Sequence, residues 1–377
     1  GTLLVPEKNP KSIYEYDENT KEGVITKYIG TDADVNIEQD FKSLGKPVTE
    51  IGNHAFANSD TLKSVIVPSS VTKLGSNAFS NSTLLESVSL PDSLTGIGEF
   101  CFTSCIKLIN VNIPGNLKSI GDGAFSDCSS IQSIELPETV NVMGEGVFSY
   151  CKSLKNVKLP RSLTDIPSYT FLECSLLQTF NFPDSITRIG EGAFFGCNQL
   201  KKVEIPDTVT SIGNEAFSSC KNLMEVKLPD NLRGIEDSLF RDCSKLTSIN
   251  IPDKLNYIGY MAFSGTSLTG TLILPTNVNY VDRTAFDNVT TLDKLIIPYA
   301  RAKCPYLGQH PYGLNENTPT QIVYGGGVPN IKARVTPTKD STGKKKYLLD
   351  FDIDFRDKDG NIYDAITRIN LPDETGE

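Results

Sequence analysis

The sequence predicts a mainly β protein in which one short structural repeat is stacked many times, and three observations support this fold class. Phe recurs every 23 residues at eleven positions, from Phe56 to Phe286. A proline follows each of these phenylalanines after twelve residues, from Pro68 to Pro298. The residues before most of these prolines alternate between apolar and polar, which is typical of a short half-buried strand. The register holds without an insertion or deletion, which indicates a repeat array rather than separate globular domains.

Each recurring position of the repeat has a structural explanation. One repeat reads I-G-x-x-A-F-x-x-C-x-x-L-x-x-V-x-L-P, and residues 189–211 and 212–234 are two copies of it. The proline ends its strand because it cannot donate to a sheet ladder. The glycine occurs in eight of the eleven repeats and suits a tight corner. The Ala-Phe pair is predicted to begin a short helical or 3₁₀ turn whose Phe packs inward. One repeat cannot bury its own apolar face, so neighbouring repeats must stack into a solenoid.

This motif resembles the BspA-like leucine-rich repeats, the Treponema pallidum type, of bacterial surface proteins, and the resemblance covers residues 48–300. It implies a right-handed leucine-rich-repeat solenoid of about eleven 23-residue repeats. It also implies a secreted or cell-surface location and a role in adhesion, including attachment to host extracellular matrix proteins.

The ends of the chain depart from the repeat. Residues 1–47 are poorly periodic and are predicted to form an N-terminal cap. Residues 301–327 contain three prolines and a Gly-Gly-Gly run, which favours a C-terminal cap passing into a linker. Residues 328–377 resemble the small β-sandwich modules of Gram-positive surface proteins. There a strand is predicted over 349–355, followed by a reversing turn at Asp359 and Gly360.

Composition argues against several functional classes. Lys and Arg number 36 against 46 Asp and Glu, which gives a net charge of −10 and disfavours a nucleic-acid binder. No run of eighteen apolar residues occurs, so no membrane span is predicted in this chain. The two histidines, His54 and His310, have no companion nucleophile or carboxylate at a recognisable spacing. We therefore predict no catalytic residue, no cofactor and no enzymatic activity.

The nine cysteines are mostly a property of the repeat. Cys101 replaces the Ala before Phe102, and Cys304 lies outside the repeats. The other seven stand three residues after a repeat Phe: Cys105, Cys128, Cys151, Cys174, Cys197, Cys220 and Cys243. The same column holds Ser, Thr or Val in other repeats, which favours a buried ladder of free thiols. A disulfide framework is the alternative, although an odd column cannot pair fully. A metal site is not predicted, because no C-x-x-C cluster occurs.

Acidic residues follow six of the repeat prolines. They are Asp92, Glu138, Asp184, Asp207, Asp230 and Asp253. Either each carboxylate caps its own turn, or the column forms a stripe for divalent cations. Turn capping is favoured, because Ser, Gly, Arg, Thr and Tyr occupy the same column in other repeats.

The outward-facing residues of the strands form the most plausible binding face. Its middle is polar with mixed charge, and it lacks the aromatic anchors typical of tight protein contacts. The residues predicted to contact a partner are Glu135, Lys158, Asn181, Lys202, Glu204, Glu225 and Lys227. The sequence therefore predicts a non-enzymatic, adhesin-like binding protein whose sheet face recognises an extracellular protein or glycan. The alternative is a structural spacer that presents other domains at the cell surface.

Overall fold

A computed structural model of the chain describes seven stretches of the sequence. They are residues 12–17, 23–42, 47–275, 277–297, 321–325, 330–339 and 345–354. The chain divides into two compact units, Gly1–Leu223 and Met224–Glu377. Each unit is described by itself below.

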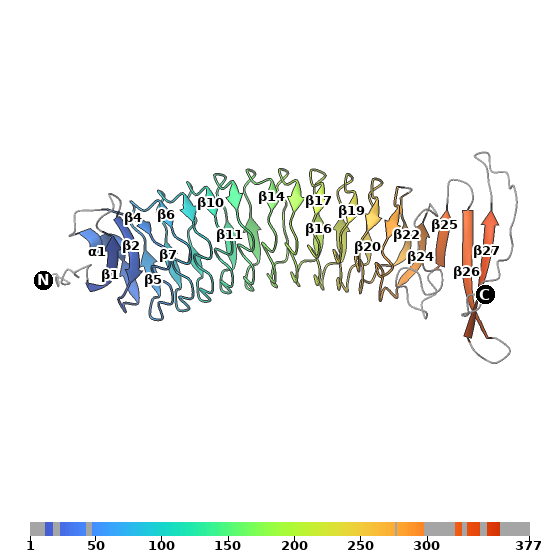
Figure 1. Cartoon of the computed structure of the whole chain (residues 1–377), viewed down its shortest axis with the longest axis horizontal. Helices are drawn as coiled ribbons and strands as arrows, with labels where there is room; N and C mark the ends of the chain where they lie inside the picture. The colour runs from blue at the N-terminus through green and yellow to red at the C-terminus, as the bar shows by residue number, and fades with distance from the viewer. Residues whose placement is uncertain are drawn as a thin grey trace. The chain divides into compact units, whose positions relative to one another are not determined.

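The first unit contains a row of short strands, one in each turn, which we call the corner strands because most of them directly precede the corner glycine. The row is parallel apart from its first pair, β1 (Tyr14–Asp17) and β2 (Gly23–Tyr28), which is antiparallel. Partners are 23 residues apart, so Ser119 pairs with both Gly96 and Val142. Figure 1 shows this row separate from the second row of strands in each turn. Its first sheet contains β1 (Tyr14–Asp17), β2 (Gly23–Tyr28), β4 (Val48–Ile51), β6 (Lys73–Leu74), β8 (Gly96–Ile97), β10 (Ser119–Ile120) and β12 (Val142–Met143). A further sheet contains β14 (Asp165–Ile166), β15 (Arg188–Ile189) and β17 (Ser211–Ile212).

The second row, which we call the front strands, lies just before the repeat prolines. In this unit it consists of β3 (Asp34–Asn36), β5 (Ser64–Ile66), β7 (Ser87–Ser89), β9 (Asn110–Val111), β11 (Ser133–Glu135), β13 (Asn156–Lys158) and β16 (Lys202–Glu204). The central residue of each strand is apolar and points inward, as Val88 does between exposed or half-buried serines. The short helix α1 (Ile37–Phe41) follows β3, and its N-cap Asn36 accepts a hydrogen bond from the Gln39 backbone. Within the described stretches, no helix is long and apolar enough to cross a membrane.

The second unit repeats the same two rows and then changes topology. Its corner strands are β19 (Gly234–Ile235), β21 (Tyr257–Ile258) and β23 (Tyr280–Val281), and its first front strands are β18 (Glu225–Lys227) and β20 (Ser248–Ile249). The last sheet contains β22 (Gly270–Ile273), β24 (Leu292–Ile297), β25 (Gln321–Gly325), β26 (Asn330–Lys339) and β27 (Lys345–Asp354). Strands β22, β24 and β25 are parallel, whereas β25, β26 and β27 are antiparallel.

At the two ends of the chain, the sequence predicts some of the observed strands and misses others. Strand β25 lies in the stretch predicted as a cap and linker, and it continues the parallel sheet of the repeats. The predicted strand over 349–355 corresponds to β27, which pairs with β26 along its whole length. The predicted turn at Asp359 and Gly360 lies outside the described residues. At the other end, Tyr28 stacks on Phe56 with ring centroids 4.9 Å apart and extends the aromatic core into the predicted N-terminal cap. The domain boundaries themselves stay predictions.

The core is a column of phenylalanines, as the sequence predicts. All eleven repeat Phe side chains are fully buried. In the first unit, consecutive rings stack at centroid distances between 5.0 and 5.9 Å, as in the pairs Phe56–Phe79 and Phe148–Phe171. In the second unit, Phe240, Phe263 and Phe286 continue the same arrangement. Each ring therefore covers the face of its neighbour, and the solenoid has one continuous aromatic interior within each unit.

The segment around each repeat Phe consists of turns closed by bonds between residues three apart, which matches the 3₁₀ alternative of the prediction rather than an α-helix. Around Phe56, the N–H groups of Ala55 and Ala57 close local turns on Gly52 and His54. The N–H groups of His54, Phe56 and Asn58 instead donate to carbonyls of the next turn. A helix would direct all of these donors into its own segment, whereas this alternation sends every second one across to the neighbouring repeat.

The prolines do more than end the front strands. In the ten described turns, the proline carbonyl accepts a hydrogen bond from the N–H three residues later, as Pro91 does from Leu94 at 3.1 Å. The proline carbonyl thus closes each turn, and capping of the turns by the acidic side chains stays a prediction. One of those side chains, Glu138, accepts from the backbone N–H of Arg161 in the following turn. Within the described residues, no group of three His, Cys, Asp or Glu is placed to hold a metal ion.

The cysteine column is a buried row of free thiols that donate hydrogen bonds. Eight of the nine cysteines are described, and all eight are free and buried. Cys128 Sγ donates to the Phe102 carbonyl at 3.1 Å, and Cys151 Sγ donates to that of Phe125 at 3.2 Å. Ser82, in the same column, makes the equivalent bond to Phe56 at 2.8 Å. Ser can therefore replace Cys because it makes the same bond, whereas buried Val289 shows that the column also accepts a side chain that cannot donate. Cys304 lies outside the described residues.

Burial of these thiols predicts a fall in stability at alkaline pH. Desolvation raises the pKa of Cys105 and of Cys151 to about 12, so each thiol binds its proton more tightly in the folded chain. A raised pKa contributes stability that is complete below the unfolded value, about 9, and is lost as the pH rises toward 12. Each thiol then costs up to about 1.4 kcal/mol per pH unit. Urea unfolding measures the free energy of unfolding at pH about 8 and about 10. Between these two pH values it should fall less for Cys151→Ser than for the parent chain, and an equal fall in both would contradict the raised pKa.

Candidate binding surface

The outward residues of the front strands form one exposed surface in each unit, which we call the sheet face. Its positions alternate with the buried central residues because successive side chains of a strand point to opposite sides. From Ser64 to Asn181 the face is small and polar apart from Ile66 and one charged pair. In the second unit it includes exposed Ile273. Such a surface can form many hydrogen bonds but offers few apolar anchors.

The predicted contact residues lie on this face, and the structure groups five of them in the first unit. Lys158 Nζ contacts Glu135 Oε1 at 2.5 Å across the turn from β11 to β13. This hydrogen bond and the charge of Glu135 raise the pKa of Lys158. Lys202 contacts Glu204 at 2.9 Å along the same strand, β16. Asn181 is exposed but belongs to no strand.

The other two predicted residues, Glu225 and Lys227, are exposed on β18 in the second unit. They flank buried Val226 and point to the same side of the strand as the sheet face of that unit. All seven side chains are therefore on exposed sheet positions or directly beside them, and their role in binding stays a prediction.

The front row is interrupted at residues 178–182, a feature that the sequence analysis missed. Phe180 and Phe182 stand where most repeats have Val and Leu or Ile. The Phe180 ring lies 5.2 Å from Phe171 and 4.8 Å from Phe194, inserted beside the central column. Among the hydrogen bonds of the described residues, none joins the backbone of 178–182 to the turn before or after it. Two bulky rings in a space sized for branched aliphatic side chains displace this strand from the ladder.

Two shallow hollows lie on the sheet face of the first unit. One has a volume of about 290 Å³ and is lined by Ser133, Ile134, Glu135, Asn156, Val157, Lys158, Thr179 and Asn181. It therefore lies beside the interruption and contains three of the predicted contact residues. The other has a volume of about 340 Å³ and is lined by Ser64, Val65, Ile66, Ser87, Val88, Ser89 and Asn112. The first hollow is the more polar of the two because it includes the charged pair and two carboxamides.

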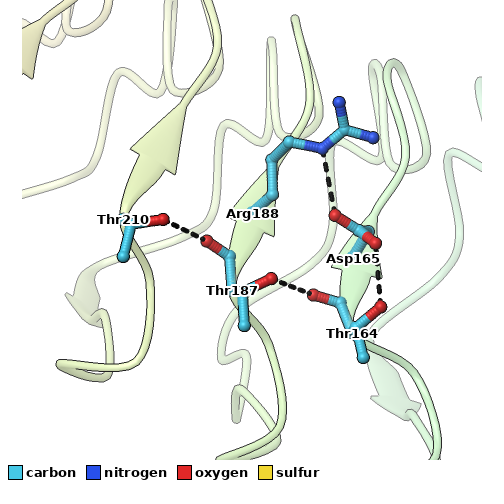
Figure 2. A network of polar contacts seen from close by, with 5 residues as sticks. All are labelled: Thr164, Asp165, Thr187, Arg188 and Thr210. Atoms are coloured by element: carbon cyan, nitrogen blue, oxygen red, sulfur yellow. Dashed lines mark hydrogen bonds and ion pairs between the residues drawn. The ribbon is translucent and has the colours of Figure 1, made fainter.

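The opposite row of strands carries polar groups that bond to one another across turns. Figure 2 shows Thr210 donating to the Thr187 carbonyl and Thr187 donating to that of Thr164, at 3.4 and 3.2 Å. Arg188 Nε contacts Asp165 at 3.0 Å in the same network, and Asp165 also accepts from the Thr164 hydroxyl. These contacts stabilise the stacking of the corner strands. Exposed residues of this row can therefore be substituted as controls for substitutions on the sheet face.

Among the described residues, His54 is the histidine that the structure places, and its surroundings contain no arrangement suited to catalysis. His54 is exposed, and its backbone N–H donates to the Ser76 carbonyl in the next turn. His310 lies outside the described residues. The buried thiols are poor nucleophiles, because their raised pKa keeps them protonated at neutral pH.

Parallel strands repeated every 23 residues around a phenylalanine column, with one exposed sheet face, define a leucine-rich-repeat solenoid. The family model described as a BspA type leucine rich repeat region of six copies matches residues 49–178 and 164–293. The chain therefore belongs to the BspA-type leucine-rich repeat family. This confirms the resemblance and the fold class that the sequence predicts.

Solved structures of bacterial proteins share this fold. A leucine rich cell surface protein from Faecalibacterium prausnitzii is 27% identical, with a TM-score of 0.56, and the match covers 83% of this chain and 93% of that one. The pneumococcal vaccine antigen PcpA is 18% identical with a TM-score of 0.55, covering 84% and 93%. A leucine-rich repeat protein from Bacteroides ovatus is 23% identical with a TM-score of 0.53, covering 82% and 98%. The last two show the fold alone. Comparison with curated proteins gives no match.

Proposed function

We propose that this chain is a non-enzymatic binding protein of the bacterial cell surface or its secreted fraction, acting as an adhesin. Its sheet face would recognise an extracellular protein or glycan, host extracellular matrix included. The observation that carries this proposal is the exposed, polar sheet face of the first unit, where Glu135, Lys158 and Asn181 line one hollow and Lys202 and Glu204 form an ion pair. Family membership supports it, because a relative of similar fold is described as a cell surface protein.

The charge arrangement indicates which substitutions test the proposal. Lys158 and Lys202 are exposed on the sheet face, each next to a carboxylate. Lys158→Glu with Lys202→Glu reverses two charges there without altering a buried side chain. Lys118→Glu with Arg188→Glu makes the same change of net charge away from the sheet face, at exposed positions on and beside corner strands β10 and β15.

The test is binding of the full chain to a panel of purified extracellular matrix proteins and immobilised glycans. For any partner found, the sheet-face pair should weaken binding by about tenfold or more, because like charges then face the partner over a desolvated contact. The corner-strand pair should change it less than about twofold. Equal effects of the two pairs, or no partner in the panel for folded protein, would count against the proposal.

The second candidate function is a structural spacer that separates other domains at the cell surface. The long run of identical turns favours it, because each repeat contacts only its neighbours and the array can be extended without a binding site. For a spacer, neither pair of substitutions alters attachment of cells that display the chain. The same variants therefore separate the two functions.

A further inference from the structure

Three asparagines occupy the same outward position of their repeats at intervals of three repeats: Asn112, Asn181 and Asn250. Asn112 uses its carboxamide to bridge two turns. Its Oδ1 accepts from the Leu90 N–H at 3.1 Å, and its Nδ2 donates to the Leu90 carbonyl at 3.0 Å. Asn250 makes the same pair of bonds with Leu228, at 2.6 and 3.0 Å. At this position a carboxamide thus recognises an amide N–H and C=O.

Asn181 is the exception. The residue at the corresponding place in the preceding turn is Leu159, and the described hydrogen bonds include none between Asn181 and Leu159. The reason is the interruption of the front row, since Phe180 and Phe182 move residues 178–182 out of the ladder. The Asn181 carboxamide is exposed and lines the hollow of about 290 Å³. Asn112 and Asn250 are exposed residues as well, but their carboxamides bond to the preceding turn, whereas that of Asn181 has no described bond to it.

The polar lining of this hollow is suited to a neutral ligand with donors and acceptors around its edge. Asn156 and Asn181 supply two carboxamides, while Ser133 and Thr179 supply two hydroxyls. Glu135 and Lys158 neutralise each other at 2.5 Å, so the hollow has no net charge from that pair. A hexose ring carries hydroxyls that both donate and accept, and its bulk is comparable with this volume. An acetamido substituent adds one N–H and one C=O on opposite edges, which the carboxamides of Asn156 on β13 and Asn181 in the next turn can bind together.

A peptide fits the hollow less well than a sugar does. Addition of a peptide strand requires an accessible sheet edge. The hollow is lined by β11, β13 and the segment of Thr179 and Asn181, so the unpaired edge of β13 faces residues of the next turn. Side-chain recognition requires apolar or aromatic anchor pockets, whereas the hollow contains no aromatic side chain. We propose that the hollow beside Asn181 binds an N-acetylhexosamine residue of a glycan. This inference rests on the proposed function, because it places the partner on the sheet face and names its chemistry.

The test is isothermal titration of the full chain with chitotriose, a trimer of N-acetylglucosamine. Cellotriose has the same ring linkage without acetamido groups and is the matched ligand. Chitotriose should bind at least about tenfold more tightly than cellotriose, and Asn181→Ala should weaken chitotriose binding by about tenfold, as expected for loss of a hydrogen bond within a polar site. Asn112→Ala should leave binding unchanged within about twofold, because that carboxamide is engaged with Leu90. Ser87→Ala, on the same face, is a second control if Asn112→Ala fails to fold.

Several results would overturn the inference. They are no binding of chitotriose to folded protein, equal binding of the two trisaccharides, or an unchanged affinity in Asn181→Ala. Binding of an acetylated Ser-Asn-Gly peptide in place of chitotriose, with the same dependence on Asn181, would replace the glycan with a protein partner. These outcomes are distinct from failure of the proposed function, because a matrix protein sensitive to Lys158→Glu with Lys202→Glu can still bind the face when chitotriose does not.

Discussion

Phe125→Ala is expected to lower the free energy of unfolding by about 3–5 kcal/mol, the range for removing a fully buried aromatic ring. Phe125 is completely buried and stacks on Phe102 at 5.2 Å and on Phe148 at 5.8 Å. Truncation opens a cavity with ring faces on both sides, and the neighbouring turns cannot move together to fill it because their backbones are fixed by inter-turn bonds such as Phe125 N–H to Val147. Urea unfolding followed by circular dichroism measures the loss.

Phe100→Ala is the matched control for this substitution. It removes the same side chain, but Phe100 is 43% exposed and lies over Gly123 at the surface. The expected loss is below about 1 kcal/mol, because little apolar area is removed from contact with the protein. Equal losses for Phe100→Ala and Phe125→Ala would show that the stacked column is not the principal source of stability.

The sequence predicts the recurring parts of this fold because the residue type that each position requires can be compared across eleven repeats. The Phe column, the strand before each proline and the cysteine column all follow from spacing and side-chain type, and the structure places them as expected except before Pro183, where the strand is missing. The reasons behind some positions are not visible in spacing. The sequence explains the cysteine column by size alone, whereas the structure shows that Cys128 and Ser82 share a donor role.

The candidate site is less predictable because it depends on a departure from the repeat. Alternation along the strand predicts that Asn181 faces outward, and it does. Spacing cannot show that its carboxamide is unlike those of Asn112 and Asn250, because all three occupy the same position. The signal that could have revealed the difference is the Thr-Phe-Asn-Phe-Pro segment, residues 179–183, where two rings replace the usual aliphatic side chains. Their effect on the ladder depends on packing, which requires the structure.

The repeat thus separates stability from recognition. Inward columns hold a narrow set of side chains and are bonded or stacked from turn to turn, whereas the outward columns of the front strands vary. A change on the sheet face alters few buried contacts, so a surface of this kind can acquire a ligand site without loss of the fold. The interruption at residues 178–182 is the place where an inward change, Phe180, also alters the outward face.

The corner glycines show a constraint that the spacing of the repeat does not specify. The sequence predicts a tight corner at these glycines, and none of the glycines that directly follow the corner strands has a positive φ. The left-handed residues instead lie two before and two after the repeat Phe, and many of them are not glycine, such as Asn77 and Asn81. The corner glycine is required by close approach. A Cβ on Gly98 would lie 2.5 Å from the backbone carbon of Gly75 in the preceding turn.

Gly98→Ala is therefore expected to destabilise the chain by more than about 2 kcal/mol, because an overlap with backbone cannot be relieved by a side-chain rotation. The turns are also held together at this point by the Gly98 N–H, which donates to the Leu74 carbonyl at 2.9 Å. Gly115→Ala is the matched control, since a Cβ there meets nothing within 4 Å and its backbone needs no positive φ. Gly115→Ala should be neutral or stabilising by up to about 1 kcal/mol through the unfolded chain. Urea unfolding of both variants gives the comparison. If Gly98→Ala were as stable as Gly115→Ala, the separation between turns would have to be adjustable, and close approach would not explain why glycine recurs at the corner.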